Sequence, residues 1–153
     1  MFSYEKESIP IVLLGILSIL VIDVPFFHYP ISTPKYLVNV DTKVNYIPFK
    51  DTKKYATIKR CGNNCSEVKY HYKKDNLHLS ILVTDKVSAS SDSIWGESRK
   101  IANTKFFYEK RKEEQLLAWI DKKNEKEIFI TYKDNKKINR NELVKVANSL
   151  SIK

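Results

Sequence analysis

Glycine and arginine are both scarce in this sequence, and each shortage excludes a class of site. The chain has 3 glycines among 153 residues, too few for the glycine-rich loops that cradle phosphates in nucleotide-binding proteins. Arginine reads bases and phosphates through paired hydrogen bonds, yet it occurs only at Arg60, Arg99, Arg111 and Arg140. A G-x-S-x-G elbow and paired carboxylates for hydrolysis are also missing. We therefore predict a non-enzymatic protein that uses no cofactor and no metal.

Lysine and aromatic residues are abundant instead. The 27 Lys and Arg residues outnumber 18 Asp and Glu, for a formal charge of +9. Such a surface attracts anions, among them phospholipid head groups, wall polymers and nucleic acid, although a solvated lysine-rich surface without a ligand is the plainer interpretation. The shortage of arginine argues against nucleic acid. The 9 Tyr and 7 Phe residues favour a β-rich globular domain.

An uncharged run, IPIVLLGILSILVI, covers residues 9–22. As a helix this run is about 21 Å long, and extension to Phe27 gives about 28 Å, close to the roughly 30 Å hydrocarbon core of a bilayer. No small-residue cleavage site and no lipoprotein cysteine follow it. A buried core helix is the alternative to a membrane anchor. We predict an anchor, with Asp23 where the helix leaves the hydrocarbon and Phe26, Phe27 and Tyr29 at the membrane interface.

The chain then divides into three parts. Residues 1–29 form the anchor with its short flank, residues 30–35 a connector bounded by prolines, and residues 36–153 a β-rich domain. The predicted fold class is α+β: an N-terminal transmembrane helix, then an antiparallel β-meander domain closed by a C-terminal helix. Positive-inside counting would place this lysine-rich domain in the cytoplasm, but that rule weakens for long domains, which translocate largely regardless of their charge. We expect the domain to lie outside the cell, partly because of its two cysteines.

Alternating patterns indicate the first meander. Residues 36–40 and 43–49 read as short strands. The clearest signal is a hairpin in which Gly-Asn-Asn joins residues 55–61 to residues 65–73. Its predicted register pairs six positions, of which Ala56, Ile58, Val68 and Tyr70 share an apolar face. The full set is Cys61 with Cys65, Arg60 with Ser66, Lys59 with Glu67, Ile58 with Val68, Thr57 with Lys69, and Ala56 with Tyr70.

The next strand, residues 77–84, completes this meander. Pairing Tyr72 with Leu77 brings Tyr70 beside Leu79 and keeps the apolar face continuous. A serine-rich stretch over residues 85–103 follows and reads as a long loop carrying Trp95.

Three further strands over residues 104–111, 114–121 and 126–133 form a second meander. We expect Tyr108 opposite Leu117, and Leu117 opposite Ile130. The other face still carries Phe107, Ala118 and Phe129. A sheet that is apolar on both faces is either covered on both or exposes a patch for a partner. The candidate patch consists of Trp95, Phe107 and Phe129.

The last predicted element is a helix. Asn139 stands at its N-cap and Glu142 three residues on, as in a capping box. Ile138 and Leu143 occupy the positions of a hydrophobic staple. Leu143, Val146, Ala147 and Leu150 then follow at helical spacing, so this stripe should pack on a sheet.

Two cysteines frame the hairpin loop. Pairing Cys61 with Cys65 places their Cα atoms about 4.5 to 5.5 Å apart, which suits a disulfide. Free thiols, or a metal or redox site, are the alternatives. A zinc site would need His71 or His78 to converge on the cysteines, and the predicted register places His71 at the far end of the strand. We therefore treat both histidines as ordinary strand residues.

The C-terminal part resembles a known family. The segments LLAWIDKKNEKEIFITY and FITYKDNKKINRNELVKVANSL are similar to the close of a Gram-positive extracytoplasmic family, domain of unknown function 4367. The resemblance covers residues 33–152 and implies a domain placed outside the cell behind a membrane helix or lipoprotein signal. It implies no catalytic residues.

The function that we expect is binding in envelope sensing or maintenance, at a single-pass membrane anchor. The expected partners are the membrane together with an anionic lipid, a wall polymer or another envelope protein. A thiol, redox or hydrolytic module outside the cell is one alternative, and a basic cytoplasmic nucleic-acid-binding domain is another.

Overall fold

The computed structural model describes residues 27–50, 52–85, 99–101, 104–133 and 139–153, with the backbone alone at 99–101, 104 and 105. The predicted anchor at 9–22, with Asp23 and Phe26, lies outside these residues. Within them, no helix has the length and apolar character that crossing a bilayer requires.

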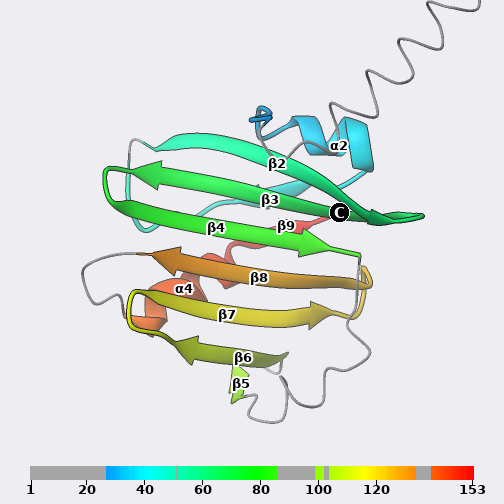
Figure 1. Ribbon diagram of the computed structural model, residues 1–153. Helices are drawn as coiled ribbons and strands as arrows, with labels where there is room; N and C mark the ends of the chain where they lie inside the picture. The colour runs from blue at the N-terminus through cyan, green and yellow to red at the C-terminus, as the bar shows by residue number, and fades with distance from the viewer. Residues whose placement is uncertain (1–26, 51, 86–98, 102–103, 134–138) are drawn as a thin grey trace, which may run out of the picture.

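An antiparallel sheet of seven strands, in the order β2-β3-β4-β8-β7-β6-β5, dominates the fold (Figure 1). The predicted meanders are both present, and they join where β4 pairs with β8. The sheet is thus two antiparallel units side by side. Its strands are β2 (Lys53–Gly62), β3 (Cys65–Lys74), β4 (Leu77–Thr84), β5 (Arg99–Ile101), β6 (Thr104–Lys110), β7 (Glu114–Asp121) and β8 (Lys126–Lys133).

The register of the β2–β3 hairpin is confirmed along its length and wrong at its tip. Ile58 pairs with Val68, as predicted, but Cys65 pairs with Gly62 rather than with Cys61. The register shifts between Arg60 and Gly62 because β2 holds an extra residue there, as in a β-bulge. The loop therefore has two residues, and the φ of 141° at Gly62 is one that side-chain-bearing residues rarely adopt.

The predicted register of β3 with β4 is wrong by two residues. Tyr72 pairs with Leu79 instead of Leu77. The cause is the turn, which contains only Asp75 and Asn76, with Asp75 at a φ of 50°. Two-residue hairpin turns need positive φ, which Asp and Asn tolerate. Because the slip is even, every side chain keeps its predicted face.

In the second meander, the predicted pairs of Tyr108 with Leu117 and of Leu117 with Ile130 are confirmed. The serine-rich stretch is not entirely a loop, since β5 lies within it and pairs with β6. Trp95 lies outside the described residues.

The predicted strand over 36–40 is wrong, because α2 (Thr33–Val38) is a helix. Pro34 sits in its first turn, where the missing N–H costs nothing, and Asn39 ends it at a φ of 54°. The strand predicted over 43–49 is likewise shortened to β1 (Thr42–Val44). β1 pairs with β9 (Leu150–Ile152). The sequence did not predict β9, because Leu150 also fits the apolar stripe of the predicted helix.

The C-terminal helix is confirmed as α4 (Arg140–Asn148), with the Asn139 side chain accepting a hydrogen bond from the backbone N–H of Asn141. Leu143 and Val146 are fully buried and pack into one core with Val68, Ile81 and other inner-face side chains of the sheet. Figure 1 shows α4 and β9 behind the sheet. α4 and β9 thus lie toward the inner face, and the opposite face carries the site described next.

Candidate functional site

We call the side of the sheet away from α4 and β9 the open face, although Tyr55, His71 and Ser80 on it are buried. It is defined by the cross-strand row of Tyr55, His71, Ser80, Thr131 and Leu116 on β2, β3, β4, β8 and β7. Residues that pair directly across strands share a face. The β pairing therefore fixes which other side chains belong to it.

Basic side chains form the next row of the open face. Lys53 pairs with Lys73, Lys73 with His78, and His78 with Lys133. We call these four residues the basic row. Since neighbouring strands lie about 4.8 Å apart, the row extends over about 14 Å. Like charges directly opposite each other destabilise a sheet, so packing alone does not favour this arrangement.

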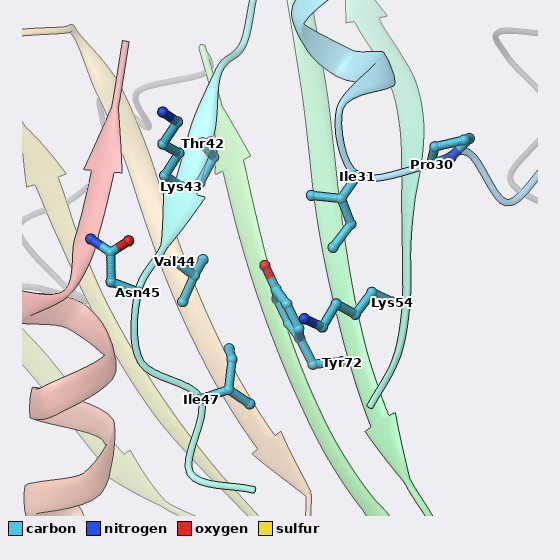
Figure 2. A pocket seen from close by; sticks show the side chains of 9 residues that line it. All are labelled: Pro30, Ile31, Thr42, Lys43, Val44, Asn45, Ile47, Lys54 and Tyr72. Atoms are coloured by element: carbon cyan, nitrogen blue, oxygen red, sulfur yellow. The ribbon is translucent and has the colours of Figure 1, made fainter. Parts of the chain in front are cut away.

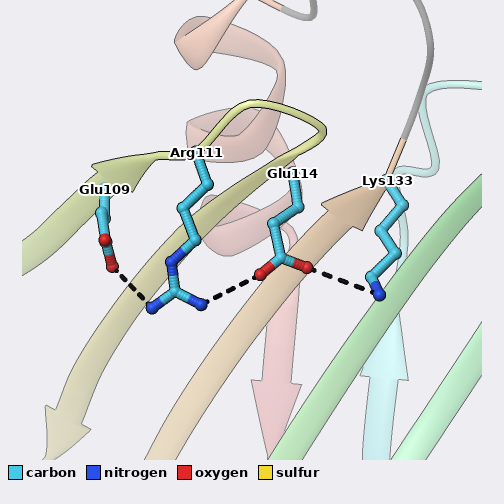
Figure 3. A network of polar contacts seen from close by, with 4 residues as sticks. All are labelled: Glu109, Arg111, Glu114 and Lys133. Carbon is cyan, nitrogen blue, oxygen red and sulfur yellow. Dashed lines mark hydrogen bonds and ion pairs between the residues drawn. The ribbon is translucent and has the colours of Figure 1, made fainter.

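Among the described residues, carboxylates lie within ion-pair distance at one end of the basic row. Glu114 lies 3.6 Å from Lys133 and 3.0 Å from Arg111, which also binds Glu109 at 2.9 Å (Figure 3). At the other end, no carboxylate of the described chain lies within ion-pair distance of Lys53, Lys73 or the nearby Lys69. The positive charge is therefore concentrated over β2, β3 and β4.

The two histidines of the open face are in direct contact. His71 Nδ1 and His78 Nε2 lie 3.0 Å apart, so one imidazole donates and the other accepts. The Tyr55 ring stacks on the other side of His71 at 4.6 Å, and the His28 ring lies 3.9 Å from Tyr55. Lys73 Nζ sits 5.4 Å from the Tyr55 ring centre. The rings and the lysines thus form one surface.

The surroundings keep both histidines neutral. Burial lowers the pKa of His71 to about 3, with further contributions from His78, Lys69, Lys73 and His28. Burial likewise lowers the pKa of His78 to about 4, and Lys73, Lys69 and Lys133 add to the effect. A bound anion would offset the repulsion from these cations. Burial would remain as the larger cause of both low pKa values.

The chemistry of these residues suits anion binding better than metal binding. The described chain holds no group of three or more His, Cys, Asp and Glu side chains that could bind a metal ion. Two imidazoles fall short of the four ligands of a structural zinc site. Ammonium groups that lack a carboxylate partner among the described residues instead match the needs of a phosphate, whereas both ring nitrogens of His71 are already engaged, by His78 and by Thr57 Oγ1.

Sequence reasoning missed the contact between His71 and His78. Both are predicted above only as ordinary strand residues. The predicted register already implies this contact, because pairing Tyr72 with Leu77 sets His71 directly opposite His78. The observed register sets His78 opposite Lys73 and diagonal to His71. Diagonal neighbours on a sheet lie within reach of large side chains.

An apolar row crosses the open face next to the histidines. Leu82 pairs with Phe129, Phe129 with Ala118, and Ala118 with Phe107. The structure thus brings Phe107 and Phe129, two residues of the candidate patch, into one row with Ala118 between them. Ala118 is fully buried, while Leu82, Phe107 and Phe129 are half-buried.

A disulfide joins Cys61 and Cys65, whose Cα atoms lie 5.1 Å apart. It sits at the tip of the β2–β3 hairpin, whereas His71 pairs with Tyr55 near the other end. The cysteines and histidines therefore belong to different parts of the strand. Of the predicted interface residues, Phe27 is exposed and Tyr29 forms a bridge to Ala56 on the edge of β2.

No family model, no curated protein and no solved structure matches this chain. The resemblance to domain of unknown function 4367 stays a prediction.

Proposed function

We propose that this chain is a membrane-tethered, non-enzymatic domain whose open face binds phosphate groups of an anionic polymer or lipid. The observation that carries the proposal is the basic row, whose lysines on β2 and β3 have no carboxylate partner in the described part of the chain. The row includes the imidazole of His78 and lies next to that of His71, and burial and nearby cations hold both neutral. A phosphate placed there would gain charge-assisted hydrogen bonds.

The tether is part of this proposal and rests on the uncharged run at residues 9–22. The disulfide supports a location outside the cytoplasm, because disulfides persist in oxidising compartments. Anchoring would hold the domain near head groups and envelope polymers, where the chain's net charge of +9 favours encounter with anions.

The test compares two double variants of the full-length chain in nanodiscs of neutral lipid. Lys53→Glu with Lys73→Glu reverses charge on the open face, and Lys112→Glu with Lys122→Glu makes the same change at exposed positions of two turns. Each chain is titrated with soluble linear polyphosphate and, separately, with vesicles of phosphatidylglycerol.

We expect the open-face variant to bind at least about tenfold more weakly than the turn variant. A preference for polyphosphate would identify a polymer as the source of the phosphate, and a preference for vesicles would identify a lipid. Equal weakening by the two variants would mean that net charge alone drives binding, which would overturn the proposal. Tight binding to DNA but to neither probe would overturn it as well.

A further inference from the structure

A groove on the inner side of the sheet lies between β1 and the Pro30–Ile31 segment (Figure 2). Its volume is about 470 Å³, within the range of ligand sites. Val44 and Ile47 contribute apolar walls, and Tyr72 and Lys54 rise from the sheet as its floor. The groove is therefore separate from the open face.

The groove runs along the unpaired backbone edge of β1. Asp41 and Lys153 exchange two backbone hydrogen bonds, at 3.2 and 2.9 Å, and the N–H of Asn45 donates to Ser149 O at 3.3 Å. Residues of an antiparallel pair alternate between facing the partner strand and facing away. Thr42 and Val44 must then point their N–H and C=O groups away from β9.

Figure 2 shows the groove on that other side of β1. Within the described chain, the backbone groups of Thr42 and Val44 have no hydrogen-bond partner there. An unpaired strand edge beside a cavity is the geometry in which an extended peptide can add to a sheet.

We propose that the groove binds an extended peptide as a third strand beside β1, with an acidic residue opposite Lys43 and an apolar residue on each side. Side chains that pair across strands share a face. The residues opposite Thr42 and Val44 would then point toward Tyr72 and Ile47 in the groove.

The acidic preference comes from Lys43. Its partner on β9 is Ser151, and its own side chain is exposed. No carboxylate of the described chain lies within ion-pair distance of Lys43. A glutamate on the added strand would stand directly opposite this lysine. The inference does not depend on the proposed function of the open face.

The probe is acetyl-Ser-Val-Glu-Val-Ser-amide, added to the ¹⁵N-labelled full-length chain in detergent micelles. We expect the amides of Thr42 and Val44 to become protected from hydrogen exchange, with little change at Lys43, which already faces β9. The same peptide N-methylated at both valines has the same side chains but lacks the two backbone donors, so we expect it to bind at least about tenfold more weakly.

Val44→Pro removes the groove-facing N–H and leaves the hydrogen bonds of Lys43 and Asn45 to β9 possible. Val44→Ala is its matched control, because it shortens the side chain and keeps the N–H. We expect the proline variant to lose binding and the alanine variant to keep most of it. Exchange protection across β8 and α4 shows whether each variant is folded.

Charge is tested by pairing Lys43→Glu with a peptide in which lysine replaces the glutamate. We expect this combination to restore the binding that either change alone reduces. Equal binding of the N-methylated peptide would mean that side chains alone hold the ligand, as for a small amphiphile, and would overturn the proposal. Absence of binding by the parent peptide at about 1 mM would overturn it too.

Discussion

The pKa values of His71 and His78 depend strongly on the residues around them. Each lies on the open face among lysines, and their ring nitrogens share one hydrogen bond at 3.0 Å. The pKa of His71 falls to about 3 and that of His78 to about 4, mainly through burial and then through nearby cations. In an unfolded chain the pKa of a histidine is about 6.5.

These shifts predict a loss of stability in mild acid. The unfolded chain takes up protons on both histidines below about pH 6.5, and the folded chain does so only near pH 4 and 3. The contribution of the two histidines to the free energy of unfolding therefore has its full value above pH 6.5 and falls as the pH decreases. Allowing for partial exposure, we expect a loss of about 1 to 2 kcal/mol between pH 7 and pH 5.

Urea titrations at pH 7 and pH 5 check this prediction, since histidines dominate side-chain titration in that window. The variant His78→Gln should lose less stability than the natural chain over the same interval. An unchanged urea midpoint between the two pH values would contradict it.

Asp85 ties three strands together at the other end of the sheet. Its carboxylate accepts hydrogen bonds from Ser66 N at 3.0 Å and Ser66 Oγ at 2.8 Å, and it forms an ion pair with Lys126. Burial acts to raise the pKa of Asp85, but the bonds from Lys126 and Ser66 outweigh it and lower that pKa.

We expect Asp85→Asn to reduce the free energy of unfolding by about 1 kcal/mol, which lowers Tm by about 2 to 4 °C. Lys126→Met should cost less, and the double variant should cost less than the sum, because both changes remove the same ion pair. Thermal unfolding of the three variants measures the coupling. Strict additivity would show that the pair contributes nothing.

At the scale of elements, the strands of the hairpins were predictable and their ends were not. The apolar face of β2 and β3 follows from the period of two, and it survives the two-residue slip of β4. The slip itself arose because the sequence pattern does not distinguish a two-residue turn from a four-residue loop. The bulge at Cys61 was hidden for a similar reason, since an extra residue leaves the alternation on either side intact.

The elements α2 and β9 were missed because tertiary contacts decide them. Residues 36–40 alternate like a strand, yet Pro34 in the first turn and Asn39 at a positive φ bound a short helix. Leu150 continues the helical stripe of α4, but it pairs with Val44 instead. No local pattern distinguishes a residue that ends a helix from one that begins a strand paired 106 positions away in the sequence.

The hairpin tip yields a prediction about the disulfide. The loop closed by Cys61 and Cys65 is short, so chain entropy limits its contribution to about 2 kcal/mol. Cys61→Ser with Cys65→Ser should therefore unfold at a lower urea concentration but keep the sheet. Gly62→Ala should also destabilise the hairpin, because alanine disfavours the φ of 141° even though its Cβ would meet no atom within 4 Å. Amide exchange on β2 and β3 distinguishes local from global loosening, and a loss of the whole sheet would contradict the first expectation.

The start of α4 provides a second test at this scale. The Asn139 side chain accepts the N–H of Asn141 at 3.0 Å. Asn139→Ala should lower the free energy of unfolding by about 1 kcal/mol, and Asn139→Asp should change it little. Urea unfolding measures both. Equal stability of the alanine and aspartate variants would mean that the cap is not used.

At the scale of the whole molecule, the sheet separates a packed face from an open one. The sequence predicted the packing of α4 on the sheet and the two sets of apolar side chains. It did not predict that β4 pairs with β8. These strands lie about 50 positions apart in the sequence, in two segments that each read as an independent meander. The basic row exists only through this joining, since Lys133 comes from the second meander and the other three residues from the first.

The proposed topology predicts the chemistry of the cysteines in cells. With the domain outside and the disulfide formed, a membrane-impermeant thiol reagent should label intact cells only after reduction. Ready labelling without reduction would indicate free, reactive thiols. Labelling only after lysis would place the domain in the cytoplasm and contradict the proposed orientation.

The most direct test of anion binding at the open face is the pKa of His78, followed by its imidazole NMR signals in the full-length chain with and without polyphosphate. A phosphate held by Lys53 and Lys73 would offset the cations that add to the effect of burial on this imidazole, so we predict that the pKa rises from about 4 by about one unit or more. The rise should disappear in the Lys53→Glu and Lys73→Glu variant. A His78 pKa that stays the same while polyphosphate binds would show that the anion sits elsewhere and would contradict the account.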